Sequence, residues 1–254
     1  MVTREGGAVL PGSAWRFTER GEVIEMYRNR REWIGVLVSS LAMMLATHSA
    51  SGGTPASEPG PPMASSFPGP LWAVEAPNGG TASVENAHLT LTVPGGSNHD
   101  AMLPSNQAVR VVEPIGNEDF DVSIKIDSLV VATAVGTSQG LMVLADKQNF
   151  ITFALVTDGT NISLTAHKVS GGVAATVSNV VSFNEYHNPM CLRLTRAGNA
   201  YTAYYSADGV VWTQAANFVD NSVPTLIGPF AGNYSRTPAN AVPVVMAINW
   251  FDVL

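Results

Sequence analysis

The segment VPGGSNHDAM places an amide, an imidazole and a carboxylate side by side, at Asn98, His99 and Asp100. Such groups could ligate a metal ion, take part in catalysis or hold the shape of a loop. Neighbouring residues of a strand point to opposite faces, so His99 and Asp100 act together only in a loop, which the preceding glycine pair favours. We interpret the trio as mainly structural, with Asn98 and Asp100 bonding backbone N–H groups and His99 at the rim. A ligand contact by the same trio is the alternative.

The acidic run Glu118, Asp119 and Asp121 is the best candidate for glycosidase chemistry. A retaining glycosidase needs two carboxylates about 5 to 5.5 Å apart. Asp119 and Asp121 could share one face of a strand, but Ser123 and Lys125 take the next positions on that face. We therefore expect a solvated start of a strand and no catalytic residues.

Other catalytic arrangements find no support in the sequence. A Gly-x-Ser-x-Gly nucleophile motif is absent, and His88, His167 and His187 are too scattered for the closely spaced pair of a zinc site. The single cysteine, Cys191, alternates with apolar residues, so we expect a small buried hydrophobic residue rather than a nucleophile. One cysteine also excludes an internal disulfide.

A carbohydrate site needs aromatic rings that stack on sugars and a few fixed polar groups that bind hydroxyls. Most aromatic residues of a sandwich must be core, because one face of each sheet is buried; of Tyr204 and Tyr205, one points inward. Our solvent-facing candidate is Tyr234, beside Asn233 and Arg236 in a loop, with the Asn-His-Asp trio as its partner. The aromatic residues considered are Tyr201, Tyr204, Tyr205, Trp212, Phe230, Tyr234, Trp250 and Phe251.

The elements that must position these residues are predicted to be strands. From residue 71 onward, short segments such as FDVSIKI alternate apolar and polar residues. Four dipeptides typical of tight hairpins separate them: Asp158-Gly159, Gly171-Gly172, Gly198-Asn199 and Asp208-Gly209. In SADGVVW we expect a hairpin whose Trp212 packs back onto the sheet. About a dozen antiparallel strands in a two-sheet jelly-roll sandwich follow.

Composition agrees with a compact body and limits its partners. Of the residues, 46% are apolar and 13% charged, and the net charge is -7. The part from 71 to 254 carries seven basic and fourteen acidic residues, which argues against a nucleic-acid partner because such affinity depends on Lys and Arg.

The first 70 residues look like an export signal and a linker rather than a folded domain. Residues 1–25 are expected to be unstructured or a mis-assigned extension before Met26, and 26–52 resemble a signal peptide with a basic flank and an apolar segment. That apolar segment, 34–46, reaches about 20 Å as a helix, too short for a stable membrane span; an uncleaved anchor is the alternative. Residues 53–70 form a disordered Pro/Gly/Ser linker. We therefore expect a secreted, periplasmic or cell-surface protein.

Several ordered segments of 71–254 carry a resemblance: GGTASVENAHLTLTVPGGSNHDAM, AVRVVEPIGNEDFDVSIKIDS, QGLMVLADKQNFITFALVTDGT, LRLTRAGNAYTAYYSADGVVWT and IGPFAGNY. In that order the chain resembles the concanavalin A-like lectin/glucanase jelly rolls, specifically the bacterial β-xylosidase C-terminal-like domain of unknown function. The resemblance implies a curved sandwich whose concave face holds the glycan in members that act on sugars. Such domains are mostly ancillary to a separate catalytic domain.

The sequence departs from that pattern in two places. Met102 stands where relatives usually have an aromatic residue, and SSFPGPLW lacks the acidic opening that contributes to a calcium site in related modules. No cofactor is expected, although Asp252 with Asp100 or Asp127 offers the oxygen ligands that calcium takes.

These observations predict an exported, non-catalytic jelly-roll protein that binds carbohydrate or has an ancillary role. One alternative is a glycoside hydrolase of the same fold acting on β-glucan or xylan. The other is a structural protein that interacts with partners at the cell surface.

Overall fold

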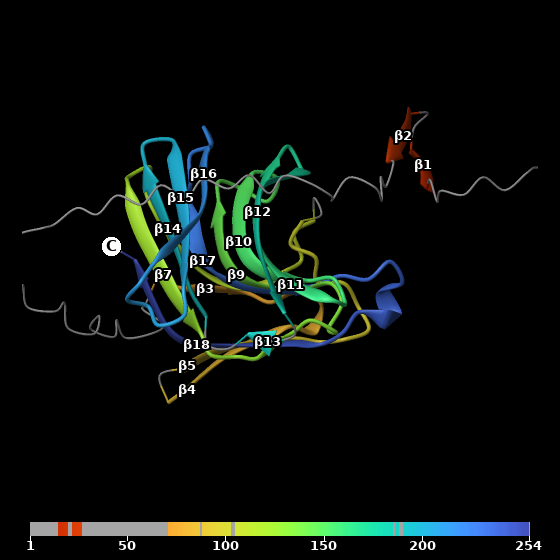
Figure 1. The fold of residues 1–254 in the computed structure, drawn as a ribbon, viewed down its shortest axis with the longest axis horizontal. Coiled ribbons are helices and arrows are strands. Elements are labelled where there is room, and N and C mark those ends of the chain that lie inside the picture. Colours follow the sequence, from red (N-terminus) through yellow and green to blue (C-terminus); the bar gives the residue numbers. More distant parts are fainter. Residues whose placement is uncertain are drawn as a thin grey trace, which may run out of the picture. The chain divides into compact units, whose positions relative to one another are not determined.

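The computed structural model describes residues 15–19, 22–26, 71–86, 88–102, 105–184, 186–187 and 190–253. From residue 71 on, this part of the chain forms two stacked antiparallel sheets of seven strands each (Figure 1). Sheet I has the strand order β12-β11-β10-β9-β17-β6-β3, and sheet II has the order β16-β15-β14-β7-β18-β5-β4. The all-β sandwich predicted from the sequence is confirmed.

The strands are short and follow one another closely. In chain order they are β3 (Ala73–Glu75), β4 (Thr81–Glu85), β5 (His88–Val93), β6 (Val109–Pro114), β7 (Phe120–Ile126), β8 (Val130–Val131), β9 (Thr137–Leu144), β10 (Phe150–Thr157), β11 (Asn161–Ser170), β12 (Val173–Asn184), β13 (Tyr186–His187), β14 (Met190–Ala197), β15 (Ala200–Ser206), β16 (Thr213–Val219), β17 (Leu226–Asn233) and β18 (Val244–Val253). Two single 3-10 turns, η1 (Pro77–Gly79) and η2 (Pro238–Asn240), interrupt them.

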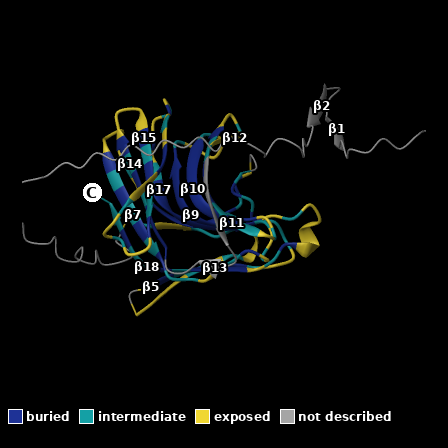
Figure 2. Cartoon of the chain, viewed as in Figure 1, coloured by how far each residue is buried: buried dark blue, intermediate teal, exposed yellow. Residues whose placement is uncertain are grey.

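Sheet II alternates as its sequence predicts. Along β7, Val122 and Ile124 are buried while Asp121 and Ser123 between them are partly exposed, and β14 continues the pattern (Figure 2). The buried side chains face sheet I and form the main core. The remaining side chains lie on the outer face of sheet II, the face turned away from sheet I.

The central strands of sheet I are buried on both faces. In β9 and β10, Leu141 and Phe153 belong to the core between the sheets. Their neighbours Met142 and Ala154 belong instead to a second apolar cluster on the outer face, together with Phe230 of β17. The loop of residues 94–108 between β5 and β6, here called the β5–β6 loop, adds Ala101 and Ala108 to this cluster. A strand buried on both faces loses its alternation, which explains why FITFALVT is almost continuously apolar.

The predicted hairpin glycines lie at turns between strands. Gly171 and Gly172 join β11 to β12 with φ values of 57° and 79°, a region that costs glycine little because it has no Cβ. The turns predicted from the sequence therefore coincide with the ends of the observed strands.

The N-terminal part is described only as a hairpin. Strand β1 (Trp15–Glu19) pairs antiparallel with β2 (Glu22–Met26), within a segment for which the sequence suggested no structure. Whether Met26 is the true start stays a prediction. The apolar signal-like segment and the linker lie outside the described residues. The helical turns η1 and η2 are each far too short to span a membrane.

Candidate functional site

The residues predicted as a ligand site meet at one end of sheet I. His99 and Asn233 form an isolated antiparallel bridge, in which each backbone N–H donates to the other's carbonyl oxygen at 3.0 and 3.2 Å. Asn98 pairs with Ser235, donating to its carbonyl oxygen at 2.9 Å and accepting its N–H at 2.8 Å. A Cβ at Gly232 would lie 2.6 Å from the His99 carbonyl oxygen, so the glycine permits this close approach. The structure thus places together the two segments that the sequence analysis paired.

The expected loop-bracing roles are found for Asn98 and Asp100, but the position expected for His99 is wrong. The Asp100 carboxylate accepts the backbone N–H of Met102 at 2.6 Å. His99 is 0% exposed rather than at the rim, because its bridge to Asn233 draws this part of the loop against β17. Its Nε2 is buried without a hydrogen-bond partner among the described groups.

Asn233 is also buried, with 1% of its surface exposed. Its Oδ1 accepts the His99 N–H at 2.8 Å, and its Nδ2 donates to the carbonyl oxygens of Pro94 and Val242 at 3.0 and 2.6 Å. Asn233 therefore ties three segments together, and it could touch a ligand only if the loop opened. Tyr234 and Arg236 are exposed, so a ligand role for them stays a prediction.

The outer face of sheet I next to this loop is filled with buried polar groups. Arg110 is 2% exposed; it donates to the carbonyl and side-chain oxygens of Asn106 at 3.3 and 2.7 Å and pairs with Glu75. Farther along, Thr165 and His167 of β11 each bury a side-chain atom that lacks a partner within the described chain. Burial lowers the pKa of His167. Among the described residues, the aromatic side chains of the apolar cluster on this face, Phe150 and Phe230, are buried.

The outer face of sheet II is different, because it carries three partly exposed aromatic residues, two of which lie beside an ion pair. Arg193 of β14 forms a two-pronged hydrogen bond with Asp121 of β7. Its guanidinium carbon lies 5.6 Å from the ring centroid of Tyr204 and 5.8 Å from that of Trp212. We call this group, together with Trp250, the aromatic platform. Arg193 and Asp121 keep 34% and 29% of their side chains exposed.

Strand register explains how these side chains share one face. Tyr204 pairs with Arg193, and Arg193 pairs with Ser123 of β7. Trp250 pairs with Lys125, which is two residues beyond Ser123 along β7. Because alternate residues of a strand point to the same side, Tyr204 faces outward while Tyr205 packs on the core. The hydrogen bonds to Asp121 raise the pKa of Arg193, so the guanidinium stays charged.

The loop from Ser206 to Val211 supports Trp212. The Asp208 carboxylate accepts the N–H groups of Val210 and Val211 at 2.8 and 2.9 Å and the Ser206 hydroxyl at 2.8 Å. These hydrogen bonds lower the pKa of Asp208 to about 2. Gly209, at φ 78°, brings the loop against Trp250 and Cys191. The expected return of Trp212 onto the sheet is found.

Cys191 lies beneath this loop and is 0% exposed. Burial raises the pKa of its thiol to about 11. The thiolate is the reactive form of cysteine, so the prediction of an inert buried residue agrees with the structure.

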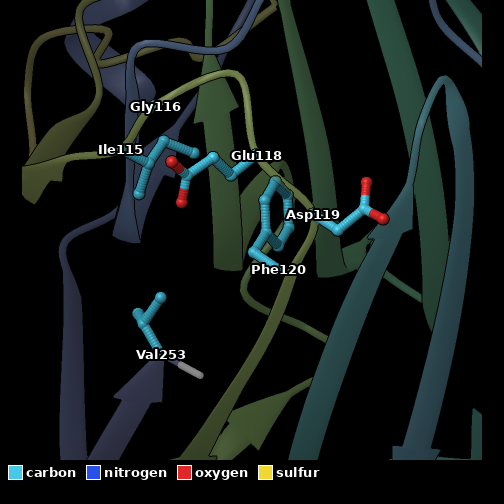
Figure 3. Close-up of a pocket in the computed structure, with 6 residues that line it drawn as sticks. All are labelled: Ile115, Gly116, Glu118, Asp119, Phe120 and Val253. Carbon is cyan, nitrogen blue, oxygen red and sulfur yellow. The ribbon is translucent and has the colours of Figure 1, made fainter.

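Two residues of the acidic run, Glu118 and Asp119, line a pocket of about 250 Å³ with Ile115, Gly116, Phe120 and Val253 (Figure 3). The Glu118 carboxylate turns toward Ile115, whereas that of Asp119 points away on the other side of Phe120. Asp119 accepts the N–H of Gly198 at 2.6 Å, and Asp121 is held by Arg193. Each of the last two carboxylates thus has a local structural partner.

The suggested calcium ligands do not form a cluster. Asp127 accepts a hydrogen bond from Asn249 at 2.8 Å, Asp252 lies opposite Ser123 in sheet II, and Asp100 belongs to the β5–β6 loop. Within the described ranges, no three acidic, histidine or cysteine side chains are grouped so as to hold a metal ion. A calcium site therefore stays a prediction.

Comparison with solved structures supports the fold. The GH43 BlXynB protein from Bacillus licheniformis is 17% identical with a TM-score of 0.56; the match covers 75% of this chain and 38% of that one. A xylan β-1,4-xylosidase from Bacillus halodurans is 16% identical with a TM-score of 0.52, covering 68% and 34%. A functionally unknown protein from Saccharomyces cerevisiae is 16% identical with a TM-score of 0.56, covering 72% and 94%.

This chain therefore spans little more than a third of the two bacterial proteins. No family model matches the sequence, and no curated protein matches it. These likenesses show a shared fold, and the two stacked antiparallel sheets fit the jelly-roll sandwich that the sequence resemblance predicted.

Proposed function

We propose that this chain is an exported, non-catalytic carbohydrate-binding module, or an ancillary one in a larger assembly, and that the aromatic platform of sheet II is its binding surface. The observation that carries the proposal is the position of Tyr204 and Trp212 beside the Arg193–Asp121 pair, with Trp250 farther along the same partly exposed face.

Such a surface suits a sugar for two reasons. Aromatic rings bury the apolar face of a pyranose, and an Arg–carboxylate pair in fixed geometry presents oriented hydrogen-bonding groups to hydroxyls. The solved structures with the same fold include a xylan β-1,4-xylosidase, which supports carbohydrate as the partner class.

A hydrolase of the same fold is the main alternative. It needs two carboxylates aimed at one bond, whereas Glu118 and Asp119 diverge and Asp121 is engaged by Arg193. These arrangements favour binding over cleavage. Incubation with β-glucan and xylan tests the point directly: we expect no release of reducing ends, and a release that Glu118→Gln removes would favour the hydrolase.

The binding test compares two surfaces of the same protein. After a glycan array has identified a bound polysaccharide, Trp212→Ala and Tyr234→Ala are compared by affinity electrophoresis. We expect Trp212→Ala to weaken retention about tenfold and Tyr234→Ala to leave it unchanged, with equal melting temperatures.

Weaker retention of Tyr234→Ala with unchanged retention of Trp212→Ala would indicate that the binding site lies at the loop near Asn98. A silent array together with co-purification of a protein partner would favour the structural interaction protein instead.

A further inference from the structure

The charges around the aromatic platform restrict what it can bind. Among the described residues, two cations near the platform are each paired with a carboxylate: Arg193 with Asp121, and Lys125 with Asp127 at 3.6 Å between their charged atoms. Asp208 and Asp252 add negative charge nearby. An acidic polymer would therefore meet a net negative surface.

The length of the platform indicates how much of a ligand it can contact. Tyr204 lies on β15 and Trp250 on β18, with β14 and β7 between them in the sheet. Three strand spacings of about 4.8 Å separate their backbones by roughly 14 Å, which is wider than a single pyranose ring. Between these two strands, Trp212 lies beside Arg193 of β14, and Gly209 lies next to Trp250.

The rings of the platform lie outside the pocket of Figure 3. That pocket is lined by Ile115, Gly116, Glu118, Asp119, Phe120 and Val253. Rings at separated points along a sheet can contact the interior of a chain along its length, whereas a small terminal sugar is typically held in a concave site.

From these observations we infer that the ligand of the platform is a neutral, extended polysaccharide chain that spans several sugar units, with Tyr204 and Trp212 contacting one part and Trp250 another. The inference rests on the proposed function and specifies its substrate class.

The test measures binding of the full chain to neutral xylo-oligosaccharides and β-gluco-oligosaccharides, from the monosaccharide to the hexasaccharide, and to polygalacturonate. We expect affinity for at least one neutral series to rise about tenfold or more with length and polygalacturonate to bind more weakly. Trp250→Ala should flatten the dependence of affinity on length, because it should weaken binding of the long oligosaccharides more than binding of the shortest one. Tyr204→Ala should weaken every length.

Preference for the acidic polymer, or affinity independent of length, would overturn the inference while leaving carbohydrate binding intact. Failure to bind any saccharide would overturn the proposed function itself. Should Trp250→Ala unfold, Trp250→Leu keeps apolar volume without an aromatic ring, and the same flattening is expected.

Discussion

The outer faces of the two sheets differ in how far their polar residues are buried. On sheet I, the β5–β6 loop and a second apolar cluster bury the outer face of the central strands. Polar residues there, such as Arg110 and Asn233, form hydrogen bonds within the protein. On sheet II, Arg193 and Asp121 also pair, yet both keep about a third of their side chains exposed. The same kinds of residue therefore hold structure on one face and remain accessible to a ligand on the other.

The comparison bears on how a binding surface is recognised in a sandwich. Polar residues beside a Gly-rich loop suggested a site at Asn98 and Asn233, but burial shows that the loop needs them for its own backbone groups. An aromatic residue in an alternating strand, such as Tyr204, is the better indicator, because the strand fixes the face that it occupies.

Truncating one aromatic residue on each face should give the largest difference. Phe230 of sheet I is 0% exposed, and Phe230→Ala is expected to lower the free energy of unfolding by about 3 to 5 kcal/mol through lost burial and a cavity. Tyr204→Ala on sheet II should cost about 1 kcal/mol or less, because that side chain is partly exposed. Urea unfolding followed by circular dichroism measures both; equal losses would mean that the two faces are packed alike.

The two arginine pairs sharpen the contrast. Arg110→Ala removes a charge that is 2% exposed and leaves Asn106 and Glu75 without their donor, for which we expect a loss of about 3 kcal/mol. Arg193→Ala breaks a partly exposed pair and should cost about 0 to 1 kcal/mol. Arg193→Lys, which keeps the charge but not the two-pronged geometry, is the matched control for ligand binding. A stability loss at Arg193 as large as at Arg110 would contradict the assignment of sheet II as the accessible face.

The smallest effect is expected from acid. Hydrogen bonds lower the pKa of Asp208 from 3.8 to about 2, so its carboxylate stabilises the loop below Trp212 at every pH above its ordinary pKa. That contribution is lost as the pH falls through about 2. We expect tryptophan fluorescence to stay constant down to about pH 4 and to change only near the lower value.

A matched comparison uses Asp146, whose pKa is also lowered by hydrogen bonds in the turn between β9 and β10. Asp208→Ala should weaken carbohydrate retention, while Asp146→Ala should not. An equal effect of both variants would indicate general destabilisation rather than support of the platform.

Part of the site could be predicted from the sequence. The alternation of β14 and β15 places Arg193 and Tyr204 on polar faces, and their adjacency follows once those strands are paired by the Gly198-Asn199 turn. Trp212 and Trp250 could not be assigned in this way, because the loop at Gly209 and the irregular register near Trp250 depend on contacts between distant segments.

The sequence by itself determined the strand-rich fold, the hairpin turns and the buried state of Cys191, since these depend on period-two patterns and local backbone preferences. Only the tertiary structure decided which outer face is covered. That outcome depends on the β5–β6 loop folding over sheet I and bonding to β17, more than 130 residues away along the chain. Local patterns record whether a residue is apolar or polar, whereas its exposure depends on which distant segment packs against it.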